Sequence, residues 1–148
     1  MHVSRFFKAL ALLVAFAAGC GCAAHSGAGA DAAGGPQAQI ELGEKLFGKH
    51  CAPCHGRSGR SGKAPPIIGE GALPEKPPSG AKMRSVEFKT AADLLDWTKQ
   101  KMPPGSANAL SESEHAAIVA FMLTESGKSL GGRTLDASSA SSISLAGR

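Results

Sequence analysis

The sequence predicts an all-α fold in which three to four short helices wrap round one covalently bound group. Apolar residues recur at helical spacing in three separate stretches of the chain. A segment rich in Gly and Pro, residues 56–85, separates the first stretch from the second and shows no periodicity. The first stretch ends in Cys51-Ala52-Pro53-Cys54-His55, where two thiols and an imidazole share one pentapeptide.

Composition indicates a single short domain. The chain has 148 residues, with 19 Gly, 9 Pro, one Trp and no Tyr, and its Gly and Ser residues crowd the two ends. We expect the domain to span residues 37–128, roughly 90 residues, a size at which a purely apolar core becomes marginal. Without Arg5 and Lys8, which lie in a segment that we expect to be removed, the formal net charge of +4 falls by two to +2. So small a charge excludes the basic surface of a nucleic-acid-binding protein.

Residues 1–19 are predicted to be a signal peptide. A basic region is followed by an apolar run, residues 9–18, that is too short to span a membrane comfortably. We therefore expect export to the periplasmic side. Residues 20–36 are rich in Ala and Gly and are expected to form a flexible linker.

Cys20 has two open interpretations. Ala17-Ala18-Gly19-Cys20 resembles a bacterial lipobox, with Ala17 where Leu is usual. In the first interpretation Cys20 becomes a lipidated first residue that anchors the protein to a membrane. In the second, cleavage falls near Ala24 and Cys20 is discarded.

A helix is expected from Gln37 to the pentapeptide. One face carries residues at steps of three and four, namely Ile40, Gly43, Phe47, Cys51 and Cys54. That face delivers both thiols to the same side. Because glycine lowers helix propensity, Gly43 indicates close approach of another backbone.

The loop at 56–85 is long for a segment without periodicity, which indicates that it wraps round something. Between positions 57 and 89, seven basic residues face three acidic ones. The basic residues are Arg57, Arg60, Lys63, Lys76, Lys82, Arg84 and Lys89. One interpretation is a solvated loop, and the other is a basic rim that attracts an acidic redox partner.

Two further helices are predicted. Thr90 is expected to cap a helix that stops before Met102-Pro103-Pro104-Gly105. Ser111 and Glu114 form a capping box for a last helix, which ends at Gly127.

Residues 129–148 are predicted to be a Ser/Ala-rich tail outside the domain. Leu135, Ile143 and Leu145 could lay a strand-like segment of this tail on the surface.

The pentapeptide has the C-x-x-C-H pattern by which c-type haem is attached. Each thiol, Cys51 and Cys54, can add to one vinyl group of the porphyrin, and His55 is then held under the iron as an axial ligand. The second ring nitrogen of His55 needs an acceptor that fixes its tautomer. We expect the carbonyl of Pro65, or else that of Pro66, to accept this hydrogen bond.

Met102 is the predicted sixth ligand of the iron. A thioether stabilises Fe(II) and raises the reduction potential. Of the other methionines, Met1 leaves with the signal peptide, Met83 lies between two cations, and Met122 lies on the core face of the last helix. Met102 follows the second helix and is held by two prolines.

Three other aromatic or imidazole side chains have weaker assignments. His50 and His115 are expected to be solvated. Trp97 is expected to pack in the core, or to lie near the porphyrin edge with its N–H on a propionate.

From Gln37 to about Gly127 the chain resembles the bacterial class I monohaem cytochromes c. The matching segments are Gly43-x-x-x-Phe47, the pentapeptide, Pro65-x-Ile67-x-Gly69, Lys101-Met102-Pro103-Pro104-Gly105 and Ile118-Val119-Ala120-Phe121. The resemblance implies the class I cytochrome c fold with one covalently bound haem c. It also implies that the first and last helices cross at Gly43, Phe47 and Phe121, and that Pro65 accepts from the axial histidine.

The resemblance implies a one-electron carrier and not an enzyme, because both axial positions of the iron would be filled. Its partners would be redox proteins, such as a periplasmic dehydrogenase, a respiratory oxidase or a cytochrome complex. Two alternatives are a peroxidase-like haem enzyme and the cytochrome subunit of a quinoprotein alcohol dehydrogenase, to which residues 92–123 are similar. A dithiol oxidoreductase is disfavoured because Cys51 and Cys54 close a helix, whereas its C-x-x-C opens one.

Overall fold

The computed structural model describes residues 34–146, and the fold of these residues is all-α, as predicted. The helices are α1 (Gly35–His50), α2 (Ala52–His55), α3 (Ala91–Lys101), the 3₁₀ turn η1 (Ala107–Ala109), α4 (Glu112–Glu125) and α5 (Ala137–Ala140). Within this part of the chain the only β pairing is an isolated antiparallel bridge between Thr90 and Ser144. The predicted signal peptide and Cys20 lie outside the described residues.

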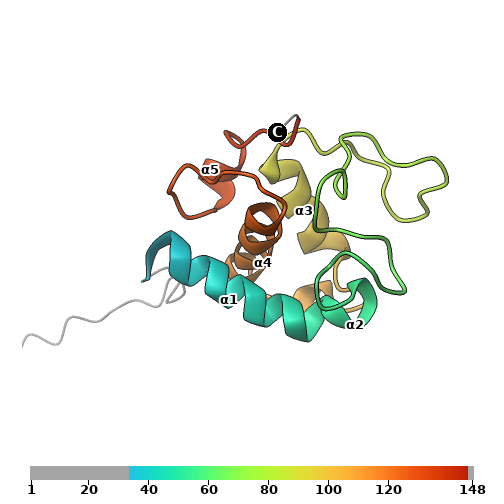
Figure 1. The fold of residues 1–148 in the computed structure, drawn as a ribbon, viewed down its shortest axis with the longest axis horizontal. Helices are drawn as coiled ribbons and strands as arrows, with labels where there is room; N and C mark the ends of the chain where they lie inside the picture. The colour runs from blue at the N-terminus through green and yellow to red at the C-terminus, as the bar shows by residue number, and fades with distance from the viewer. Residues whose placement is uncertain (1–33, 147–148) are drawn as a thin grey trace, which may run out of the picture.

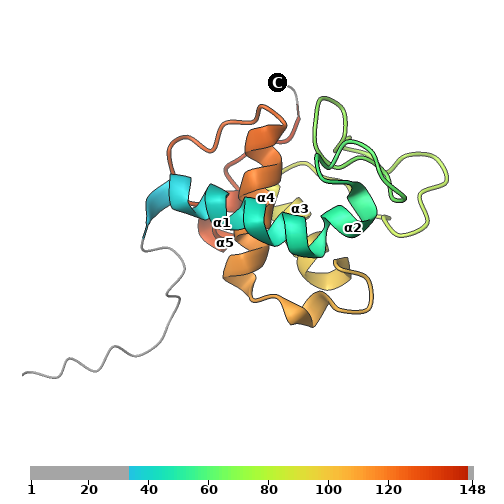
Figure 2. The same ribbon diagram turned by 60° about the horizontal axis from the view of Figure 1, so that its bottom comes forward.

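Helices α1 and α4 cross each other at the centre of the molecule (Figures 1 and 2). At the crossing, a Cβ atom added to Gly43 would lie 2.0 Å from the carbonyl oxygen of Ala117. The rings of Phe47 and Phe121 pack beside this point with centroids 5.4 Å apart. The glycine therefore lets two backbones touch, as the sequence indicated.

The predicted first helix is interrupted at Cys51, which is a correction to its expected continuity. Cys51 still donates its N–H to Phe47 at 2.9 Å, but its backbone then departs from helical values, with φ −111° and ψ −40°. Pro53 explains the break, because a proline has no N–H to continue the hydrogen-bond ladder of α1. The short helix α2 begins directly afterwards and carries Cys54 and His55.

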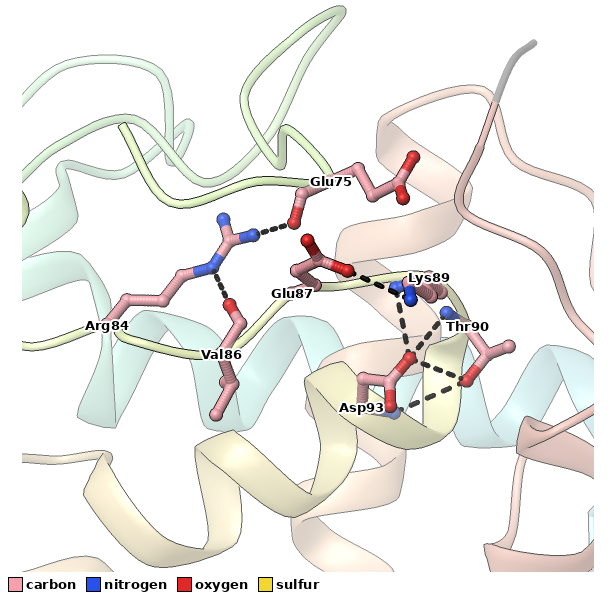
Figure 3. A network of polar contacts seen from close by, with 7 residues as sticks. All are labelled: Glu75, Arg84, Val86, Glu87, Lys89, Thr90 and Asp93. Carbon is pink, nitrogen blue, oxygen red and sulfur yellow. Dashed lines mark hydrogen bonds and ion pairs between the residues drawn. The ribbon is translucent and has the colours of Figure 1, made fainter. Parts of the chain in front are cut away.

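Both predicted helix caps are present. The hydroxyl of Thr90 accepts from the N–H of Asp93, and the Asp93 carboxylate accepts the N–H of Thr90 at 2.8 Å (Figure 3). These hydrogen bonds lower the pKa of Asp93, with the backbone N–H of Thr90 as the largest cause. Ser111 and Glu114 form the same reciprocal pair at the start of α4.

The tail is part of the core, which corrects the expectation that it lies on the surface outside the domain. Its apolar side chains are buried against α3 and α4, namely Leu130, Leu135, Ala140, Ile143 and Leu145. Gln39 of α1 binds the tail through two hydrogen bonds of 2.7 Å, one to the N–H and one to the carbonyl of Leu135. The tail therefore closes the side of α4 that α1 and α3 leave open.

Candidate functional site

The pentapeptide lies at the far end of α1, where α2 meets the loop of residues 56–68 (Figure 1). Cys51 is half-buried, Cys54 is exposed, and His55 is 9% exposed. Both cysteines are free thiols in this structure. The junction of α1 and α2 thus presents two sulfur atoms and one imidazole from five consecutive residues.

His55 is oriented by the loop that follows it. Its Nδ1 lies 2.7 Å from the carbonyl oxygen of Pro65. A carbonyl oxygen only accepts hydrogen bonds, so Nδ1 carries the proton and Nε2 is left with a free lone pair. An imidazole in this tautomer can ligate iron through Nε2, with a second partner that holds the ring in place. This is the contact that the sequence analysis assigned to Pro65 in preference to Pro66.

Glycines allow the loop to fold back tightly enough to bring Pro65 to the histidine. Gly56 has φ +80°, and a Cβ atom there would lie 1.7 Å from the carbonyl oxygen of Ser61. The N–H of Ala64 then donates to the carbonyl of Cys54 at 2.9 Å, which returns the chain to α2 one residue before Pro65. Any side chain at position 56 would push this turn away from the imidazole.

The thiols do not resemble those of a dithiol oxidoreductase. Burial, followed by repulsion from Cys54, raises the pKa of the Cys51 thiol to about 11. Redox-active C-x-x-C sites lower the pKa of a thiol below its ordinary value, because the thiolate is the nucleophile. The environment of Cys51 thus favours a neutral thiol, which agrees with the expectation from the sequence that a dithiol oxidoreductase is disfavoured.

Met102 lies where α3 ends, on a different element from His55. Its N–H donates to Thr98 at 2.9 Å, and its backbone turns out of the helix with φ −126° and ψ 138°. The side chain is half-buried. By contrast, Met83 is 50% exposed, while Met122 is 3% exposed in an apolar cluster with Phe47. Burial therefore leaves Met102 as the methionine best suited to a ligand role, although the iron bond itself stays a prediction.

Trp97 supplies an independent test of whether the chain fits a haem. Its Nε1 atom is buried and has no hydrogen-bond partner among the described residues. Buried indole N–H groups normally find an acceptor, and an orphan donor costs about 1–3 kcal/mol. The ring packs edge-on against Phe88, with centroids 5.8 Å apart. A haem carboxylate is an acceptor of the right kind, so the donor set fits this group.

The structure corrects the sequence assignment of His115. The residue is 3% exposed, and its Nε2 lies 3.2 Å from the carbonyl of Ala107, to which it donates. We expected a solvated side chain, but α1, α3 and the tail cover α4 on several sides, and residues 115–120 are all buried. His50 is half-buried. His115 has a structural hydrogen bond and is separate from the pentapeptide.

Two other classes of site are not found in the described part of the chain. Residues 34–146 contain no group of three or more His, Cys, Asp or Glu side chains that could hold a metal ion. None of the helices described is long and apolar enough to cross a membrane.

Comparisons with known proteins identify the family of this chain. Residues 38–122 match the family model described as cytochrome c oxidase, cbb3-type, subunit III. No curated protein sequence matches the chain.

One solved structure shares the fold. The crystal structure of the sulfane dehydrogenase SoxCD from Paracoccus pantotrophus has a chain that superposes with a TM-score of 0.54 at 24% identity. The match covers 72% of our chain and 53% of that chain, so it spans about half of the SoxCD chain's length. At this identity the likeness shows the fold alone.

Proposed function

Since the chain belongs to the cytochrome c family that includes cbb3-type cytochrome c oxidase subunit III, and carries one covalently bound haem c, we propose that it is a one-electron carrier. When bound, the haem supplies an iron that alternates between Fe(II) and Fe(III). Cys51 and Cys54 would hold the porphyrin through thioether bonds. His55, through Nε2, and Met102, through its sulfur atom, would be the protein ligands of the iron.

The observation that carries this proposal is the fixed tautomer of His55. The carbonyl oxygen of Pro65 lies 2.7 Å from Nδ1 of His55, which leaves Nε2 as the ring nitrogen available to ligate the iron. A ligand fixed in this way changes little when the iron changes charge. A small change of geometry between the two oxidation states is what a fast carrier needs.

Met102 is proposed as the ligand that closes the sixth position. A closed position leaves no site for a substrate or peroxide, so the chain would perform no bond-breaking step of its own. The half-buried setting of Met102 and its place at the end of α3 support this assignment.

The proposed setting is the periplasmic side, with redox proteins as partners. The signal peptide of residues 1–19 and the lipobox-like Cys20 support export, and lipidation of Cys20 would add a membrane anchor. Radiolabelled palmitate incorporated by the wild type but not by Cys20→Ser would establish the anchor. Label in neither protein would favour removal of Cys20.

A second candidate is the cytochrome subunit of a dehydrogenase complex. It is favoured by the structural likeness to a chain of a sulfane dehydrogenase, SoxCD, of which our chain spans 53%. The two candidates share the same site and differ in whether the chain stays attached to an enzyme. Co-purification of the untagged protein from its own cells in a fixed ratio with a dehydrogenase would support the second.

The ligand assignment is tested by optical spectroscopy of the ferric protein. A Met–iron bond gives a weak far-red band, which we expect in the wild type and not in Met102→Ala. Met83→Ala is the matched control and should keep the band, because the Met83 side chain is half exposed to solvent on a surface loop. A normal band in Met102→Ala would contradict the assignment.

A further inference from the structure

Residues 76–87 form an Ω-loop, a surface loop whose two ends lie close together. The ends are joined where the N–H of Phe88 donates to the carbonyl of Glu75 at 2.8 Å. Both ribbon views show this yellow-green segment extending away from the helices (Figures 1 and 2). Compact loops of this kind are frequently functional.

Arg84 holds the Ω-loop in one shape. Its guanidinium donates to the carbonyls of Val86, at 2.9 Å, and of Glu75 (Figure 3). It also donates to the carbonyl of Pro74 at 2.6 Å. The same group stacks 3.6 Å from the centroid of the Phe88 ring. A loop that is already ordered loses little conformational entropy when a partner binds it.

The Ω-loop exposes apolar side chains and positive charge to solvent. Met83 and Val86, 50% and 45% exposed, are the large hydrophobic side chains that the described residues leave open to solvent. The loop carries Lys76, Lys82 and Arg84 against a single acid. That acid, Glu87, is already paired with Lys89 at 2.9 Å.

The two lysines of this loop, Lys76 and Lys82, form no ion pair within residues 34–146. Lys76 does act on Glu87 at longer range: the hydrogen bond and charge of Lys89, and more weakly the charge of Lys76, lower the pKa of that carboxyl. The ion pairs found there join Lys89 to Glu87 and Lys99 to Glu112. Lys76 and Lys82 are exposed and in no such pair, and the hydrogen bonds of Arg84 go to backbone carbonyls, which carry no net charge. A net positive face of this kind is complementary to an acidic surface.

The base of the Ω-loop leads toward the proposed haem. Phe88 follows the loop directly and packs against Trp97 with centroids 5.8 Å apart. Trp97 carries the buried N–H group without a partner that we assign to a haem carboxylate. A protein seated on the loop would therefore lie one aromatic contact from Trp97, the side chain that we assign to a haem carboxylate.

We propose that the Ω-loop of residues 76–87 is the docking surface for an acidic redox protein, which would contact the exposed apolar side chains of Met83 and Val86 and the exposed lysines, Lys76 and Lys82. This inference rests on the proposed function. Transient electron-transfer complexes have small interfaces and use charge complementarity to speed encounter. A second copy of this chain is a poor occupant, because two positive loops repel each other.

The test uses the full holoprotein and a gold electrode coated with a carboxylate-terminated monolayer as a probe for an acidic surface. We expect the wild type to adsorb and exchange electrons at low ionic strength, and high salt to weaken both. Lys76→Glu with Lys82→Glu should reduce the adsorbed amount and the electron-transfer rate at least tenfold. The matched control, Lys45→Glu with Lys49→Glu on α1, makes the same change of charge and should retain most of both.

A separate variant tests the two exposed apolar side chains of the loop. Met83→Ser with Val86→Ser should leave the low-salt behaviour nearly intact and reduce the fraction that stays adsorbed at high salt several-fold. Because all four loop positions are exposed, equal thermal unfolding of variants and wild type is expected and shows that folding is not the cause.

Three results would overturn the docking proposal. In the first, the loop variants adsorb and exchange electrons as the wild type does, or the α1 control loses as much adsorption as the loop variants do. In the second, sedimentation shows a dimer that Lys82→Glu disrupts, which assigns the face to a second copy. In the third, the protein binds phosphatidylglycerol vesicles through Met83 and Val86 but ignores the electrode. A redox titration with a soluble mediator distinguishes failure of the docking proposal from failure of the proposed function. A wrong docking surface would leave the one-electron titration intact, whereas a wrong proposed function would abolish it.

Discussion

Replacing Gly43 with alanine sets two physical effects of opposite sign against each other. Alanine has the higher helix propensity, which favours the variant by about 1 kcal/mol. At this position, however, the new Cβ would lie 2.0 Å from the carbonyl oxygen of Ala117 and 2.9 Å from the Cβ of Phe121. Ordinary contact begins near 3.4 Å, so α1 and α4 would have to separate by about 1.4 Å.

The clash should decide the outcome. Overpacking costs about 1–3 kcal/mol, and the upper end applies because the obstacle is helix backbone and cannot rotate away. We therefore expect Gly43→Ala to lower the free energy of unfolding by about 2 kcal/mol, measured on the holoprotein by urea titration and circular dichroism. With a slope of about 2 kcal/mol per molar urea, the midpoint falls by about 1 M.

Gly48 provides the matched control on the same helix. A Cβ atom there meets nothing within 4 Å. Gly48→Ala should therefore stabilise the protein by up to about 1 kcal/mol, through propensity alone. If Gly43→Ala proved as stable as Gly48→Ala, the close crossing of α1 and α4 would be refuted.

Three further changes test other parts of the molecule. Gln39→Ala should lower the free energy of unfolding by about 1–3 kcal/mol in urea titrations, because it leaves the buried N–H and carbonyl of Leu135 unpaired. A loss below ~0.5 kcal/mol would show that the tail does not depend on these two hydrogen bonds. Trp97→Phe should lower the midpoint potential of the haem by up to ~59 mV, which is a tenfold change in a one-electron equilibrium. The reason is that a haem carboxylate without its indole donor favours Fe(III). An unchanged potential in voltammetry would show that the indole does not bind a haem carboxylate. The hydroxyl of Ser138 is the largest cause that lowers the pKa of Asp136 from 3.8 to about 2. A lowered pKa in the folded state gives stability that is present above pH 3.8 and lost as pH falls toward 2. The melting temperature of Asp136→Asn should therefore depend less on pH in this window than that of the wild type. Parallel pH profiles of the two melting temperatures would contradict this.

Local signals explain what the sequence predicted well. Capping boxes join residues three positions apart, so Thr90 and Ser111 could be identified as helix starts from their own neighbourhood. The role of Gly43 followed from its place on an apolar helix face. The contact of His55 with Pro65 was expected because the resemblance assigned it, and the structure contains it at 2.7 Å.

What the sequence missed depends on contacts between distant segments. The tail is polar in composition, and its burial depends on a surface made by α3 and α4 and on Gln39, which lies 96 positions from Leu135. The packing of α1, α3 and the tail around α4 also buries His115, whose polarity suggested an exposed position. Arg84 looked like one cation among several, because its hydrogen bonds to three backbone carbonyls have no sequence pattern.

The central claim is that the chain holds one covalent haem and transfers one electron through it. The most direct test is a reductive titration of the purified holoprotein, preceded by extraction with acidic acetone. We predict that the haem stays with the protein, that one electron is taken up per chain with a one-electron Nernst slope, and that the ferrous form does not bind carbon monoxide. Haem released into the acetone would contradict the attachment at Cys51 and Cys54, and rapid binding of carbon monoxide would contradict a closed iron.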